Sequence, residues 1–426
     1  MTYAAFAARL RATQVLSDPW VHGEPRFREE AVILASPVLA ELYAAAEDMA
    51  RLSNEVCTVV AQDPSLLDTH FALSPCQKLM WLAAGPSWHG IARADVFRTA
   101  AGLKVCELNC DTPSGQAEAV LLGQLARAAR PARATERDPN AELLERYVAM
   151  VFAIARRARA AAGAAATQGP PSIGILYPTE MTEDLSMVEL YRQAFSRAGA
   201  IVTLGSPYNL TLAPSGRASL FGRECDALIR HYKTDWWGER EPAWDDAIPV
   251  PDGAPLAGPL GVALAAEAHG GTAFVNPFGA VVPQNKRAMA LMWEAMDRFS
   301  PWAQDAIARL VPETRRLETL SAETLRTGKD AWVLKSDYGC EGAEVVMGHA
   351  CTAEEWRMAT DHAVPGRWVA QRRFVPAVET ADGESINYGV YVVAGEASGV
   401  LARLQTGATD IYARTAPLLV VDEEPS

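Results

Sequence analysis

Apolar residues recur at every third or fourth position through much of the first part of the chain. The clearest stretch is AVILASPVLAELYAAAEDMARLSNEV, at 31–56, with an interruption expected at Pro37. Such spacing is typical of an amphipathic helix, and proline within it predicts a break. Residues 141–162, rich in alanine and arginine, predict another helix. Because of the helical spacing at 31–56, the region 1–90 is expected to be mainly helical.

The middle of the chain has a different pattern, in which short apolar runs alternate with a helical segment. IGILY at 173–177 and AIVTL at 200–204 predict strands, a helix is expected across 184–198, and a third strand at 227–232. This order is typical of a small doubly wound α/β unit. The loop 178–184 follows the first strand, where such sheets bind ligands.

From about residue 270 the chain again alternates strands and helices, which predicts a mixed α/β (α+β) fold. A chain of 426 residues is too long for one ordinary core, so two or three domains are expected. The boundaries we expect are a helical region at 1–165, a small α/β subdomain at 166–265, and a third region at 266–426.

Composition narrows the class of protein. The net charge of −13, without a long basic run, argues against binding to nucleic acid or to an anionic membrane. No run of 18 apolar residues is present, and the N-terminal stretch carries arginines, so neither a membrane span nor a secretory signal is expected. Seven scattered cysteines without a CxxC motif favour a reducing, cytoplasmic location over a disulfide or zinc framework.

The most informative polar pattern is Arg93-Ala94-Asp95 followed by Glu107-Leu108-Asn109. The intervening VFRTAAGLKVC predicts two strands joined by a turn at 100–102. Folding this hairpin about Ala101 places Asp95 opposite Glu107 and Arg93 opposite Asn109. Residues two apart on a strand project from the same face, so Glu107 and Asn109 should lie side by side.

Two facing carboxylates repel each other unless a cation lies between them. Carboxylate and amide oxygens suit Mg²⁺, so Asp95, Glu107 and Asn109 are candidate metal ligands. An arginine beside them suggests phosphate as a further ligand. The alternative is a hairpin whose charges are simply solvated.

A second candidate site follows the apolar strand that ends at Lys335. A lysine there can neutralise phosphate oxygens, and Gly339 and Gly342 would let backbone amides approach them. The alternative is a hairpin turn with an exposed lysine.

Two more basic segments could contact a nucleotide. Gln371-Arg372-Arg373-Phe374 follows an apolar strand whose backbone could read an adenine edge, although an edge strand with a basic end would look the same. Arg403 could reach a transferring phosphoryl group, although a surface arginine is the default.

These segments together resemble the glutathionylspermidine synthase family, a circularly permuted branch of the ATP-grasp ligases. The resemblance lies in RADVF…KVCELNCDTPSG, VVPQNKRAMALMWE, WVLKSDYGCEGAEVVMG, VAQRRFVP and YGVYVVAGEASGVLARL, in the family's order across roughly 90–415. It covers the synthetase part only, and it implies an ATP-grasp-like fold with 266–426 as the nucleotide-binding region.

The resemblance also implies roles for individual residues. Arg93 and Arg403 would be catalytic, stabilising an acyl phosphate and the transition state. Mg²⁺ would be held by Asp95, Glu107 and Asn109. The remaining implied positions are Lys286, Lys335, Gly339, Gly342 and Ala343 for the ATP phosphates, Gln371, Arg372, Arg373 and Phe374 for the adenine, Thr112 and Ser114 for the carboxylate substrate, and Glu183 and Asp184 for the acceptor.

The implied reaction is a Mg²⁺- and ATP-dependent C–N ligation of a small-molecule carboxylate, such as a peptide, with an amine. A homodimer is a further expectation from the family. Two alternatives remain: a non-catalytic ATP-binding partner of another ligase, and a structural domain without a nucleotide site.

Overall fold

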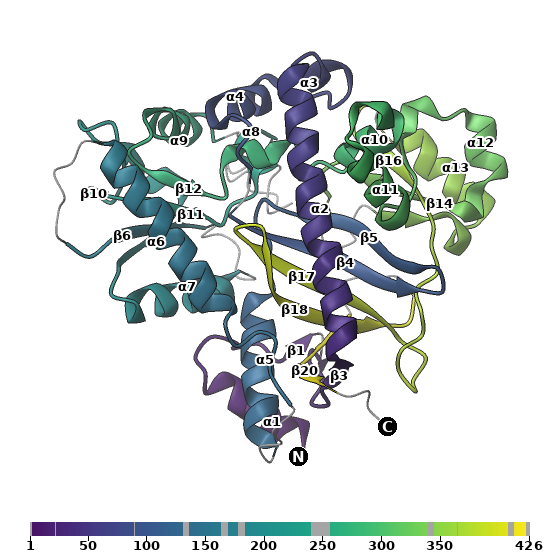
Figure 1. The fold of residues 1–426 in the computed structure, drawn as a ribbon, viewed down its shortest axis with the longest axis horizontal. Coiled ribbons are helices and arrows are strands. Elements are labelled where there is room, and N and C mark those ends of the chain that lie inside the picture. The colour runs from purple at the N-terminus through teal and green to yellow at the C-terminus, as the bar shows by residue number, and fades with distance from the viewer. Residues whose placement is uncertain are drawn as a thin grey trace, which may run out of the picture. The chain divides into compact units, whose positions relative to one another are not determined.

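The computed structural model describes most of the chain, which falls into two compact units (Figure 1). The first unit contains Met1–Pro19, Ser74–Ala92 and Cys110–Val281, and the second contains Trp20–Leu73, Arg93–Asn109 and Val282–Ser426. Within these, the described residues are 2–21, 23–88, 90–130, 136–162, 169–177, 184–239, 256–339, 345–363, 365–407 and 413–422.

The first unit is built on a parallel four-stranded sheet in the order β12-β11-β6-β7, beside an antiparallel sheet in the order β10-β9-β8. The strands of the two sheets are β6 (Ser172–Leu176), β7 (Ile201–Gly205), β11 (Ala227–Arg230), β12 (Ala273–Val275), β8 (Leu210–Leu212), β9 (Ala218–Leu220) and β10 (Arg223–Glu224). Its helices are α1 (Tyr3–Arg11), α4 (Pro75–Ala84), α5 (Gln116–Ala129), α6 (Leu143–Ala161), α7 (Leu185–Arg197), α8 (Thr234–Glu239) and α9 (Ala257–His269).

The predicted β-α-β unit is confirmed. Strand β6 pairs in parallel with β7 on one side and with β11 on the other, and α7 connects β6 to β7. The chain therefore reverses its direction of winding between β6 and β11. In open α/β sheets such a reversal leaves a crevice at the carboxyl ends of the two strands.

The second unit contains a five-stranded sheet in the order β19-β18-β17-β4-β5 and a four-stranded sheet in the order β13-β16-β14-β15. Their strands are β4 (Ile91–Thr99), β5 (Gly102–Asn109), β17 (Ser385–Val393), β18 (Glu396–Gln405), β19 (Arg414–Ala416), β13 (Thr314–Arg316), β14 (Trp332–Ser336), β15 (Val345–Met347) and β16 (Trp368–Arg372). Two smaller pairs are β1 (Trp20–Val21) with β2 (Glu24–Pro25), and β3 (Val32–Ala35) with β20 (Leu418–Val421).

The long helix α2 (Ser36–Gln62) crosses the five-stranded sheet and contacts β5, β17 and β18 (Figure 1). Its buried face repeats at helical spacing, as the apolar pattern predicts. The expected interruption at Pro37 is wrong: residues 32–35 form β3, and Pro37 lies in the first turn of α2, where a missing N–H is tolerated. The unit's other α-helices are α3 (Leu66–Thr69), α10 (Arg287–Glu294), α11 (Pro301–Leu310), α12 (Ala322–Thr327) and α13 (Ala353–His362).

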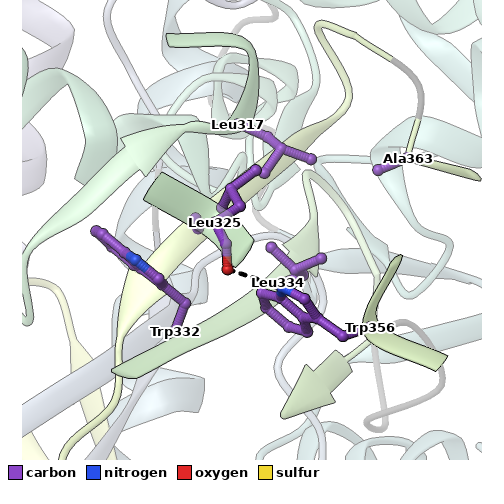
Figure 2. Packing of buried hydrophobic residues seen from close by; sticks show 7 residues of the cluster. Leu317, Leu325, Trp332, Leu334, Trp356 and Ala363 are labelled. Atoms are coloured by element: carbon purple, nitrogen blue, oxygen red, sulfur yellow. Dashed lines mark hydrogen bonds between the residues drawn. The ribbon is translucent and has the colours of Figure 1, made fainter. Parts of the chain in front are cut away.

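An apolar cluster supports the strand that carries Lys335. Figure 2 shows Trp332 and Leu334 of β14 with Trp356 of α13, whose indole N–H donates to the carbonyl of Leu325 at 3.0 Å. Because alternate residues of a strand face opposite sides, packing Trp332 and Leu334 into the core turns Lys335 the other way. The described helices include none that is both long and apolar enough to cross a membrane.

Candidate functional site

The hairpin of β4 and β5 has the predicted pairing, with Asp95 opposite Glu107 and Arg93 opposite Asn109. Near the turn, however, the register is one residue different, because Val96 pairs with Val105. The extra residue on β5 forms a bulge, which re-aims the side chains beyond it. Folding about Ala101 therefore predicts the polar pairs correctly, although the turn itself is tighter.

The centre of the site is an ion cluster in which the buried Arg93 and the half-buried Arg403 both contact the buried Asp95. Arg93 Nε donates to Asp95 Oδ1 at 2.8 Å, and Arg403 Nη2 donates to Asp95 Oδ2 at 2.6 Å. Burial alone would raise the pKa of Asp95, but the two guanidinium groups lower it to about 2. Asp95 is thus held as a carboxylate, and the cluster keeps one net positive charge.

Strand β17 contributes two further residues that sequence analysis missed. Asn387 lies opposite Arg403, is buried, and donates from Nδ2 to Asp95 Oδ2 at 3.4 Å. Gly389 lies beneath Arg93, since a Cβ there would meet Arg93 Cδ at 2.7 Å. The signal available in the sequence was a polar residue and a glycine, two apart, inside the apolar strand SINYGVYVV.

At the open end of the hairpin, acidic and amide side chains meet a lysine. Asn109 Nδ2 donates to Glu107 Oε1 at 3.2 Å, and Lys286 Nζ lies 3.8 Å from Glu107 Oε2. The same ammonium donates to the carbonyl of Gly339 at 2.6 Å. A pocket forms here, lined by Glu107, Asn109 and Lys286 among others.

Lys335 also turns toward this hairpin. Its ammonium donates to the carbonyl of Cys106 at 3.2 Å, and the amide of the buried Gln371 donates to the same oxygen at 3.4 Å. Two lysines far apart in sequence therefore both approach β5. Such an arrangement provides positive charge where phosphate oxygens could bind.

The other expected nucleotide residues lie at the end of β16 and beyond. Arg372 and Arg373 are exposed, and the Arg372 guanidinium lies 4.0 Å from the ring centroid of Trp332. Phe374 contacts Phe97, with ring centroids 5.4 Å apart. Their part in adenine binding stays a prediction.

The donor set fits Mg²⁺ in chemistry. Asp95, Glu107 and Asn109 supply carboxylate and amide oxygens, which are the hard ligands that this cation prefers. The amide N–H₂ of Asn109 faces Glu107, which leaves its Oδ1 on the other side. Among the described residues no group of three or more His, Cys, Asp or Glu could hold a metal, so an all-carboxylate or histidine site is not found there.

Several expected substrate residues belong to the first unit. Thr112 and Ser114 precede α5, whose N-terminal capping position is Gly115, with a φ of +89° that suits glycine. Asp184 precedes α7, and its Oδ1 lies 3.2 Å from Nε2 of the buried His231. Glu183, Gly342 and Ala343 lie outside the described residues.

The known proteins that this chain resembles in fold are distant from it in sequence. A solved structure of a glutathione synthetase-like effector (GSS30) from Globodera pallida, in the apo form, has a TM-score of 0.61 and 8% identity, covering 99% of this chain and 98% of that one. A putative γ-glutamylcysteine synthetase from Methylobacillus flagellatus has a TM-score of 0.45 and 14% identity over 86% of each chain. No curated protein matches the sequence.

The superposition on the first of these structures shows a shared fold, and the predicted mixed α/β class is confirmed. The profile of one sequence family, described as glutathionylspermidine synthase preATP-grasp, matches residues 15–421. Because this match spans nearly the whole chain, the protein belongs to the glutathionylspermidine synthase preATP-grasp family.

Proposed function

We propose that the protein is a Mg²⁺- and ATP-dependent ligase that joins a small-molecule carboxylate to an amine through an acyl phosphate. The observation that carries this proposal is the largely buried cluster of Arg93, Asp95 and Arg403 beside the two lysines of the site. Family membership supports a ligase-type function, and the charge distribution supports phosphoryl chemistry in particular.

In the first step, a carboxylate oxygen of the substrate attacks the γ-phosphorus of ATP, the bond from that phosphorus to the β–γ bridging oxygen breaks, and ADP leaves. Negative charge spreads over the transferring group. Arg93 and Arg403 would stabilise that charge, because Asp95 orients both guanidinium groups without neutralising both of them.

In the second step, the amine nitrogen attacks the acyl carbon, inorganic phosphate leaves, and the nitrogen loses a proton as the amide forms. Lys286 and Lys335 would hold phosphate oxygens in place during both steps. Asp95, Glu107 and Asn109 would hold Mg²⁺, which supplies further charge neutralisation when bound.

The test is ADP release from Mg²⁺-ATP with pairs of carboxylates and amines, including glutathione with spermidine, and with products identified by mass spectrometry. Glu107→Ala serves as the blank. A condensed product made by the wild type but not by the variant is the expected result. ATP binding without turnover on any pair would instead support a non-catalytic ATP-binding partner protein. Turnover that survives intact in Glu107→Ala would overturn the metal assignment.

A further inference from the structure

The pocket beside the hairpin contains a buried polar group that the proposed reaction has not used. Asn285 lines this pocket together with Glu107, Asn109 and Lys286, and the residue is 0% exposed. Its Nδ2 has no hydrogen-bond partner among the described residues. A buried donor without an acceptor is unfavourable, so its retention here calls for an explanation.

The orientation of this amide is set by the backbone. Asn285 Oδ1 accepts a hydrogen bond from the backbone N–H of Arg287 at 2.8 Å, in the first turn of α10. Only the oxygen of the amide can accept that bond, so the N–H₂ group must point away from the helix. The unpartnered donor is therefore a consequence of the fold and cannot be removed by rotating the amide.

The group that satisfies this donor must be an acceptor, and the surroundings indicate its charge. Lys286, next in the chain, has its ammonium at the same pocket, and this ammonium interacts with Glu107 and with the Gly339 carbonyl. A donor next to a lysine favours an anionic oxygen, and amide or ammonium donors bind such oxygens more strongly than neutral ones.

We propose that Asn285 is a phosphate-binding residue that donates from Nδ2 to a phosphate oxygen of the nucleotide, alongside Lys286. This inference rests on the proposed function. It adds a neutral donor to a site otherwise described by its charged groups, and it gives Asn285 two roles. Oδ1 holds the start of α10, and Nδ2 binds the ligand.

Two variants separate these roles. Asn285→Ser retains a short oxygen that can accept the Arg287 N–H, as serine does in local turns, but it has no amide donor. Asn285→Asp retains the acceptor and replaces the donor with a negative charge. Asn54→Asp, at an exposed position on α2 of the same unit, controls for an added negative charge.

The measurement is isothermal titration of each variant with the non-hydrolysable ATP analogue AMP-PNP and Mg²⁺, with thermal unfolding as a check on folding. Loss of a hydrogen bond to a charged group predicts roughly 10- to 100-fold weaker binding by Asn285→Ser, and weaker binding still by Asn285→Asp. Asn54→Asp should bind as the wild type does.

Three results would count against the inference in different ways. Binding by Asn285→Ser within about threefold of the wild type overturns it, because the donor then contributes little. Weak binding by Asn285→Asp alone would be an effect of charge and would overturn it as well. If the wild type binds no nucleotide, the proposed function falls together with the inference, and the binding curve of the wild type distinguishes that case.

Discussion

Gly389 is the position where a single methyl group should disturb the ion cluster most directly. An alanine Cβ at this place would lie 2.7 Å from Arg93 Cδ and 3.1 Å from Arg93 Nε. Ordinary contact begins near 3.4 Å, so Arg93 or the backbone of β17 must move by about 0.7 Å. Arg93 Nε donates the 2.8 Å hydrogen bond to Asp95 Oδ1, so the shift strains this hydrogen bond.

The expected loss of stability in Gly389→Ala is about 1–3 kcal/mol, the usual range for an added methyl group in a packed interior. The cost cannot be avoided by releasing Arg93, since separating a buried ion pair is itself unfavourable by about 3–5 kcal/mol. If the proposed reaction is correct, displacing one charge-stabilising group should also lower the rate of ADP release by about 10²-fold.

The assay combines urea unfolding with ADP release at saturating substrates. Val390→Ala is the matched control, because Val390 is the next residue of β17, is fully buried, and faces the opposite side of the sheet. It should lose similar stability with little loss of turnover. The reasoning is refuted if Gly389→Ala unfolds within about 0.5 kcal/mol of the wild type, a change typical of uncrowded surface sites.

Three further predictions concern stability. Burial raises the pKa of Glu267 to about 7, so the folded state binds its proton more tightly, and the free energy of unfolding should fall as pH rises from about 4.5 to 7. Glu267→Gln should remove up to about 3 kcal/mol of this pH dependence. The same difference in unfolding free energy between wild type and variant at pH 4 and at pH 8 would contradict the prediction. Burial lowers the pKa of His70 to about 4, so the stability that the neutral imidazole contributes is complete above pH 6.5 and is lost as pH falls toward 4. In His70→Asn, the free energy of unfolding in urea should depend less on pH over that range. An unchanged pH dependence would show that another group titrates. Trp356→Phe retains an aromatic ring but leaves the Leu325 carbonyl without its hydrogen-bond donor. The free energy of unfolding in urea should therefore fall by about 1–3 kcal/mol. No measurable change would mean that water replaces the indole N–H as the donor.

Much of the local structure could be predicted from the sequence, because it depends on neighbours along the chain. The spacing of apolar residues predicted α6, α7 and three of the four strands of the parallel sheet, β6, β7 and β11. The hairpin pairing of Asp95 with Glu107 followed from a turn only a few residues away. Local reasoning failed at Pro37, because residues 32–35 form a strand and the helix begins only after them.

The composition of the ion cluster was decided by the tertiary structure. Arg403 is 308 residues from Asp95 in sequence, and the two meet because β17 and β18 lie beside β4 in one sheet. No local pattern specifies which distant strand becomes a neighbour, so Asn387 and Gly389 look like ordinary strand residues until the sheet order is known.

The sequence by itself therefore determined most of the local elements, the pairing of polar residues across the hairpin, and the family. The tertiary structure decided which groups share a buried environment, and with it the charge of Asp95 and the unsatisfied donor of Asn285. The physical reason is that burial and electrostatic interaction depend on distance in space, while the sequence orders residues only along the chain.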